Sequence, residues 1–115
     1  MAASVRQLFA NSNITTTQTV VLGASTTFVA MASLSMLDSL TDFDRDNAAV
    51  IDIPFVDGVS TNVQVFGGDH WGSNGNFNNV RDTALVRFGR TVTFRLRSIG
   101  PDLDAFGCGV VITNP

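Results

Sequence analysis

Alternating acids at residues 42–46 are the first place where this chain could do chemistry. Closely spaced carboxylates can surround a hard cation, so Asp42, Asp44 and Asp46 are candidate calcium ligands. An EF-hand would need a bidentate Glu where this chain has Ile53, so that motif is excluded. Two interpretations stay open: a calcium site of another kind, or a solvated turn whose Asp side chains cap backbone amides.

A second candidate is Asp69-His70-Trp71, within a Gly- and Asn-rich stretch predicted to be a long loop over Gly67–Asn79. A histidine beside an aspartate can act as a general base. Catalysis would also need a nucleophile, an oxyanion donor or a metal, and no recognised nucleophile motif surrounds this pair. We therefore expect no catalytic role for Asp69 and His70.

The same stretch has aromatic residues that could bind a ligand. Trp71, with Phe77 nearby, could present an aromatic platform among Asn and Asp side chains. Such a platform suits a sugar or another protein, because Trp is a favoured interface anchor. The alternative is that Trp71 covers the open end of the core.

Arginines form the third candidate, since five of the seven lie between Arg81 and Arg97. Alternation places Arg95 and Arg97 on the strand face opposite Phe94 and Leu96. They could contact an acidic protein surface, or they could be a solvated face paired with Asp side chains. A net charge of −3 argues against a nucleic-acid partner.

Other catalytic and cofactor motifs are missing. Gly67-Gly68 lacks the Lys-Ser/Thr of a phosphate loop, and one His with one Cys cannot supply the usual zinc ligands. The apolar neighbours of Cys108 predict a buried thiol. We expect no enzyme activity and no cofactor.

The elements that position these residues are predicted to be short strands. Thr- and Val-rich runs and period-2 alternation are separated by Gly, Asn, Pro and Asp-Gly turn signals. Gly89-Arg90 is interpreted as the turn of a hairpin, and 31–40 could instead be a buried helix. The predicted strands are 4–9, 14–22, 26–34, 49–55, 61–66, 85–88, 92–96 and 110–113.

Composition agrees with an all-β class. All seven bases are Arg and all ten acids are Asp, so the chain lacks Lys and Glu, which favour exposed helix faces. About eight strands in 115 residues predict one domain over 1–115, an antiparallel β-sandwich or barrel, with a jelly-roll-like arrangement preferred.

No secretory signal or membrane-spanning run is expected, so the predicted origin is a host cytoplasm without membrane contact. In its Thr/Asn/Gly-rich strands, such as 13–19, the chain resembles small bacteriophage virion proteins of the capsid-decoration or fibre- and spike-head type. The resemblance extends over the whole chain without a specific motif. It implies a location in the virion, attachment to a capsid or tail, and assembly as trimers or higher rings.

An apolar surplus favours contacts with other proteins. Beyond the inward faces, an apolar stretch is formed by Val29, Met31, Met36, Leu37 and Leu40. Nine Phe are many for a chain of this size, and an exposed apolar patch usually marks an interface. We therefore predict a homo-oligomer that contacts other virion proteins such as the capsid protein. The alternative function is a carbohydrate- or receptor-binding module of a tail fibre or spike, with a glycan bound at Trp71.

Overall fold

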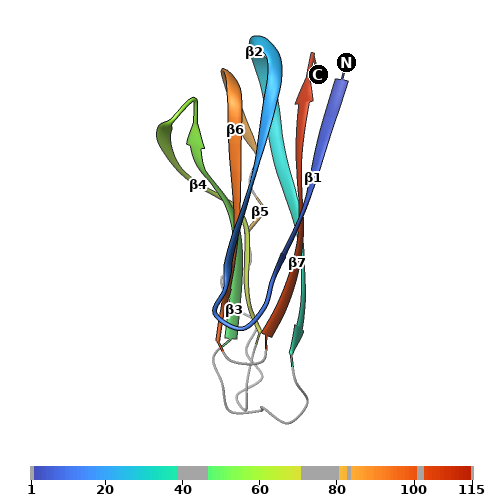
Figure 1. The fold of residues 1–115 in the computed structure, drawn as a ribbon, viewed down its shortest axis with the longest axis vertical. Coiled ribbons are helices and arrows are strands. Elements are labelled where there is room, and N and C mark those ends of the chain that lie inside the picture. The colour runs from blue at the N-terminus through green and yellow to red at the C-terminus, as the bar shows by residue number, and fades with distance from the viewer. Residues whose placement is uncertain (1, 39–46, 71–80, 83, 101–102, 115) are drawn as a thin grey trace.

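The computed structural model describes residues 2–38, 47–70, 81–82, 84–100 and 103–114, with the backbone alone at 38, 47, 66–70 and 81–82. These residues form an all-β structure without a helix. Figure 1 shows long strands that run along the longest axis of an elongated molecule of 48 × 23 × 20 Å. The strands are β1 (Ala2–Ala10), β2 (Thr15–Asp38), β3 (Asn47–Val56), β4 (Val59–His70), β5 (Arg81–Asp82), β6 (Leu85–Ile99) and β7 (Leu103–Thr113).

All seven strands belong to one antiparallel sheet with the order β1-β7-β2-β6-β3-β4-β5. The sheet is not closed, because β1 pairs only with β7 and β5 only with β4 among the described residues. The all-β class is thus confirmed, whereas a sandwich or barrel of eight strands is not. The expected number was too high because two pairs of predicted strands are single long strands, β2 and β6.

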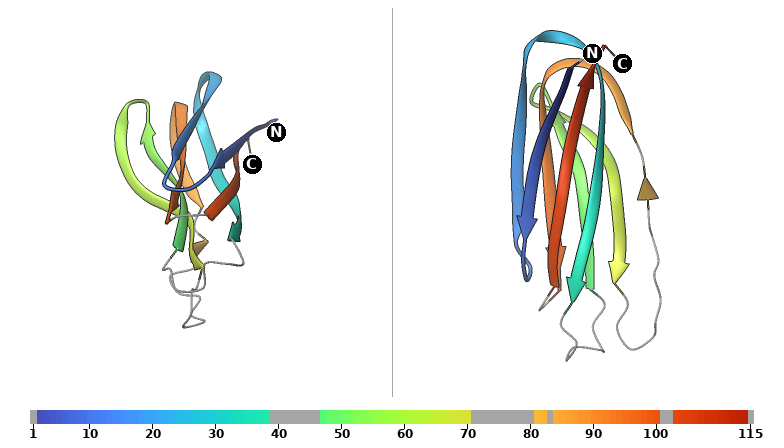
Figure 2. Two further views of the ribbon diagram at one scale, coloured as in Figure 1. Left: turned by 60° about the horizontal axis from the view of Figure 1, so that its bottom comes forward. Right: turned by 90° about the vertical axis from the view of Figure 1, so that its right-hand side faces the viewer.

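Both long strands bend where turns were predicted. The pairing of β2 with β6 shifts between Val21, which pairs with Thr91, and Thr26, which pairs with Gly89, so residues 22–25 lie opposite Arg90 at the bend of β6. The predicted hairpin at Gly89-Arg90 is therefore wrong. In the right-hand view of Figure 2, β2 rises along one side, passes over the top and descends on the other side.

The bends divide the sheet into two arms, which we define by their residues. The first arm contains Thr15–Val21 of β2, 91–99 of β6, and β3 with β4. The second arm contains β1, β7, Thr26–Asp38 of β2 and 85–89 of β6. The stretch 31–40, for which a helix was the alternative, is strand as far as Asp38.

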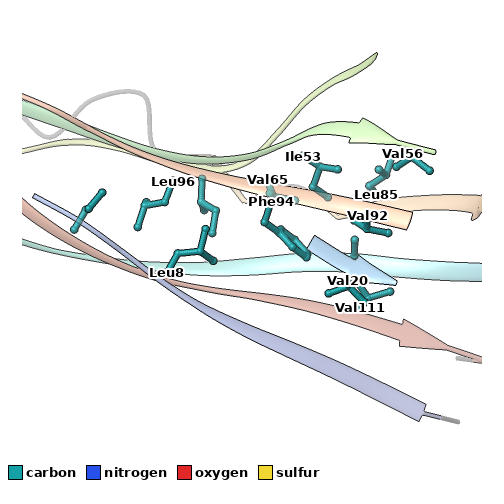
Figure 3. Packing of buried hydrophobic residues seen from close by; sticks show 14 of the residues in the cluster. Leu8, Val20, Ile53, Val56, Val65, Leu85, Val92, Phe94, Leu96 and Val111 are labelled. Carbon is teal, nitrogen blue, oxygen red and sulfur yellow. The ribbon is translucent and has the colours of Figure 1, made fainter. Parts of the chain in front are cut away.

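The core lies between the two arms. Figure 3 shows Leu8 and Val111 on one side and Ile53, Phe94 and Leu96 on the other, with their side chains meeting in the middle. Inward positions alternate along β6, as the sequence predicted: Val92, Phe94 and Leu96 are completely buried. Burial of apolar surface at about 25 cal/mol per Å² therefore holds the folded-over sheet together.

Glycines of β7 let the arms approach closely. A Cβ added at Gly109 would lie 2.6 Å from Cγ of Phe94, and one at Gly107 would lie 3.0 Å from Cδ1 of Ile51. Neither β6 nor β3 is a hydrogen-bonded neighbour of β7. These contacts therefore join the inner faces of opposite arms, and any side chain larger than hydrogen at Gly109 would push the Phe94 ring aside.

The β3–β4 turn fastens the bend of β6. Asp57 and Gly58 both have positive φ, 51° and 75°, as a two-residue hairpin turn of type I′ requires. The Asp57 carboxylate accepts hydrogen bonds from the backbone N–H groups of Arg90 (3.0 Å) and Thr91 (2.8 Å). Nε of Arg90 donates to the carbonyl of Leu22 at 2.9 Å, so both bends are held together at one end of the molecule.

Candidate functional site

The predicted site residues are not gathered in one place. Asp42, Asp44, Asp46, Trp71 and Phe77 lie outside the described residues, so the calcium and aromatic-platform hypotheses stay predictions. Within the described residues, no group of three or more His, Cys, Asp or Glu side chains could hold a metal ion.

The backbone of Asp69 and His70 belongs to β4, where these residues pair with Ala48 and Asn47. The loop predicted from Gly67 is thus wrong at its beginning, because β4 continues through His70.

Arg95 and Arg97 lie on the outer face of the first arm, as alternation predicted. Arg95 stands directly opposite Asp52 of β3 in the ladder. Its guanidinium donates from Nε to Oδ1 of Asp52 at 3.1 Å and from Nη2 to Oδ2 at 2.7 Å. Arg97 adds a longer bond from Nη2 to Oδ2 at 3.5 Å, so both arginines converge on one carboxylate.

Burial makes this cluster a structural feature of the sheet. Only 11% of the Asp52 side chain is exposed, whereas the two guanidinium-bearing side chains are 33% and 38% exposed. The hydrogen bond to Asp52 raises the pKa of Arg95 above its ordinary value, so the guanidinium stays charged at any physiological pH. The interpretation in which the arginines pair with Asp side chains is confirmed for Arg95 and Arg97.

Much of the rest of this outer face is polar, although Val21, Phe55 and Ile99 are exposed on it. Thr15, Thr17 and Thr19 of β2 lie opposite Arg97, Arg95 and Thr93 in the ladder, and directly paired residues share a face. A polar depression of about 390 Å³ adjoins the cluster, lined among others by Asp52, Gln64 and Arg95. We define this surface, over β2, β6 and β3, as the polar outer face.

The outer face of the second arm has the opposite character. The register places the outward residues of β1, β7, β2 and β6 in cross-strand rows, such as Val5–Val110–Met31 and Phe9–Phe106–Ser35. Seven of its large apolar side chains are between 39% and 66% exposed: Val5, Phe9, Met31, Leu37, Val86, Phe88 and Phe106. Half-buried Val29, Cys108, Val110 and Ile112 fill the rows between them. We call this surface the apolar outer face.

Its area is large for a single chain. We take roughly 180 Å² as the full surface of one large apolar side chain. The exposed fractions of the seven side chains then sum to about 700 Å² of apolar surface. The largest apolar patch on a typical monomer measures roughly 300–600 Å². Of the described outward side chains, only Asp104 at the rim is charged. This surface therefore has the size and chemistry of an interface.

A ridge and a hollow stand side by side on the apolar outer face. The rings of Phe9 and Phe106 pack with centroids 5.0 Å apart and planes at 47°. Phe9 and Phe106 also form one wall of a depression of about 580 Å³, whose lining includes Gln7, Ser33 and Cys108. The depression lies over the row Leu8–Gly107–Leu34, and the row Gln7–Cys108–Ser33, which has no bulky apolar group, forms its other side.

Three sequence expectations are corrected here. Cys108 is half-buried on the outer face and not a fully buried thiol. Period-2 alternation in the sequence places Phe55 on the same strand face as Ile51 and Ile53, but Phe55 is 45% exposed, because an irregularity in β3 between Ile53 and Phe55 changes its side of the strand. Of the predicted apolar stretch, Met31 and Leu37 are exposed, whereas Met36 packs against the core.

No known protein-family model matches the chain, and no curated protein sequence is significantly similar to it. In the part of the chain that is described, no helix is long and apolar enough to cross a bilayer. The apolar outer face was not predicted as a surface. A signal for it is present in runs such as Val110-Val111-Ile112, which are apolar on both strand faces, a pattern typical of strands covered on both sides.

Proposed function

We propose that this protein is a non-enzymatic structural component of a virus or bacteriophage particle, a capsid-decoration or other assembly protein that works through oligomeric protein–protein contacts. The apolar outer face carries the proposal, since about 700 Å² of uncharged surface is unfavourable in water unless a protein covers it. The particle itself is inferred from the resemblance of the Thr/Asn/Gly-rich strands to virion proteins.

The same proposal includes a jelly-roll-like sandwich formed by the two arms of the sheet. The packing of Phe94 against Gly109 across the core supports a sandwich-like arrangement of the two arms. Because each of β2 and β6 contributes a segment to both arms, a jelly-roll-like sandwich of about eight strand segments stays the preferred interpretation.

The position of the gene, antibody labelling of particles and sedimentation test the proposed function. We expect the gene to lie beside terminase and capsid genes, and an antibody against the protein to label purified particles in electron micrographs. A gene among metabolic enzymes together with unlabelled particles would contradict a virion role. Sedimentation should show self-association, and a clean 12.2 kDa monomer at high micromolar concentration would contradict the oligomeric part.

The alternative is a carbohydrate- or receptor-binding head of a fibre or spike. It depends on Trp71 and Phe77, which lie outside the described residues, so no observed contact favours it. Specific binding on a glycan array, lost on Trp71→Ala and kept on Phe55→Ala, would favour it over the assembly role.

A further inference from the structure

The apolar outer face has features that match those of a second copy of itself. Its uncovered area of about 700 Å² is close to the roughly 800 Å² that each partner contributes to a standard protein interface. Apart from Asp104 at its rim, the described outward side chains are neutral, so two such faces can meet without removing charges from water.

The relief of the surface suits a two-fold arrangement. A two-fold interface is self-complementary: if one residue of the first copy contacts another of the second, the reverse contact also forms. Here the Phe9–Phe106 ridge adjoins the depression of about 580 Å³ beside Ser33 and Cys108. A two-fold axis between ridge and hollow would place the ridge of each copy in the hollow of the other.

We infer that the protein forms a two-fold dimer through the apolar outer face, with Phe9 and Phe106 of each copy seated in the depression beside Ser33 and Cys108 of the other. This inference rests on the proposed function, for which it names the first contact of assembly. Two β faces packed in this way lie about 10 Å apart, which is the usual spacing of stacked sheets.

The polar outer face does not compete for this role. Its central charges, Asp52 and Arg95, already pair with one another, and threonines surround them. Phe55 on that face is exposed to 45%, almost the same as the 46% of Phe106. Phe55 is thus a matched control: the same residue type and exposure, on the opposite surface of the molecule.

The test compares Phe106→Asp with Phe55→Asp by analytical ultracentrifugation across micromolar concentrations. We expect Phe106→Asp to weaken dimerisation by about 100-fold or more, because each dimer would bury two unpaired carboxylates. Phe55→Asp should change the dissociation constant by less than about threefold, as residues outside an interface usually do. Circular dichroism checks that each variant is folded.

Two further measurements test whether the dimer forms through the apolar outer face, even if Phe106→Asp does not fold. Ser33→Trp fills the depression from an exposed position of β2, and should also weaken dimerisation. Cys108 of the unmodified protein is half-buried in the depression, so its reaction with a maleimide should slow as protein concentration rises.

The outcomes separate this inference from the proposed function. Equal self-association of the wild type, Phe106→Asp and Ser33→Trp would overturn the inference and leave an oligomeric role intact, through another surface. Concentration-independent reactivity of Cys108 in a protein that does dimerise would also overturn it. A wild type that stays monomeric would overturn both the inference and the oligomeric part of the proposed function.

Discussion

Gly109→Ala tests whether the two arms of the sheet pack against each other as described. The new Cβ would lie 2.6 Å from Cγ of Phe94 and 2.7 Å from both Cδ atoms, whereas carbon atoms in favourable contact are roughly 3.5–4.0 Å apart. Phe94 is completely buried, so its ring has no open space to enter. The overlap of about 1 Å must be relieved by movement of a whole arm.

The magnitude follows from two opposing effects. Overpacking a filled core usually costs about 1–3 kcal/mol. Replacing Gly by Ala at a compatible φ returns about 0.5–1 kcal/mol by restricting the unfolded chain. With an overlap this deep, we expect the free energy of unfolding to fall by about 2 kcal/mol, which lowers Tm by about 8 °C in a domain of this size.

Two other glycines provide graded controls in the same assay, urea and thermal unfolding followed by circular dichroism. A Cβ at Gly107 would meet the terminal Cδ1 of Ile51 at 3.0 Å, and a rotation of that methyl group can relieve the contact, so the loss should stay below about 1 kcal/mol. At Gly23 nothing lies within 4 Å, so Gly23→Ala should be neutral or slightly stabilising.

A second substitution, Phe94→Leu, tests whether contact with the Phe94 ring causes the loss of stability in Gly109→Ala. Phe94→Leu removes the ring and should cost about 1–2 kcal/mol by itself. In that background Gly109→Ala should cost less than about 1 kcal/mol, so the double variant is more stable than the sum of the single effects predicts. Equal effects of Gly109→Ala and Gly23→Ala, or additivity with Phe94→Leu, would refute the face-to-face packing of β7 on β6.

Other predictions concern the bend, the ion pairs, a buried hydroxyl and the acidic segment. Asp57→Ala should lower the free energy of unfolding, measured in urea, by about 3 kcal/mol, because two backbone N–H groups lose a charged acceptor and alanine disfavours a φ of 51°. Asp57→Asn should lower it by only about 1 kcal/mol. Asp52→Ala should lower the free energy of unfolding by about 2 kcal/mol, because Arg95 and Arg97 lose their carboxylate partner. Arg95→Lys should lower it by about 1 kcal/mol, because lysine cannot form the two parallel hydrogen bonds. Equal stability of the wild type and both variants would contradict these expectations. Ser98→Ala should lower the free energy of unfolding by about 1 kcal/mol, since the buried hydroxyl donates to the carbonyl of Leu103 at 2.7 Å. Ser25→Ala, at an exposed position, should be neutral in the same thermal assay. If Asp42, Asp44 and Asp46 form a solvated turn, millimolar calcium will leave Tm unchanged, and a rise in Tm that is lost on Asp44→Asn would establish a calcium site instead.

The sequence was a good guide to which residues face inward. Period-2 alternation placed Val92, Phe94 and Leu96 in the core, and placed Arg95 and Arg97 outside, as the structure confirms. Alternation succeeds here because it depends only on the geometry of a strand whose one face is buried.

Continuity of the strands could not be predicted in the same way. A Gly-containing pair between two apolar runs usually marks a hairpin, and Gly89-Arg90 fits that pattern. In the structure the N–H groups of Arg90 and Thr91 donate to Asp57, a residue more than thirty positions away, and the strand continues through the bend. Only a distant partner makes a bend more favourable than a turn, and local sequence carries no information about that partner.

The apolar outer face could not be predicted for a related reason. Phe55 changes faces through a local irregularity of β3, and Cys108 proved to lie outside although its neighbours are apolar. The apolar neighbours of Cys108 predicted a buried thiol, because a sequence does not show whether the second face of a strand is covered by the same chain or exposed.

The bends also mark a change in the chemistry of the outer surface. Before its bend β2 presents Thr15, Thr17 and Thr19, and after it Val29 and Met31; β6 presents Val86 and Phe88 first, then threonines and arginines. Threonine forms strands as readily as valine, so strand propensity does not require apolar residues on the second arm. Core packing does not require them either, because they point away from the core. The outward apolar surface of about 700 Å² on the second arm is therefore the observation from which we propose contact with another protein surface.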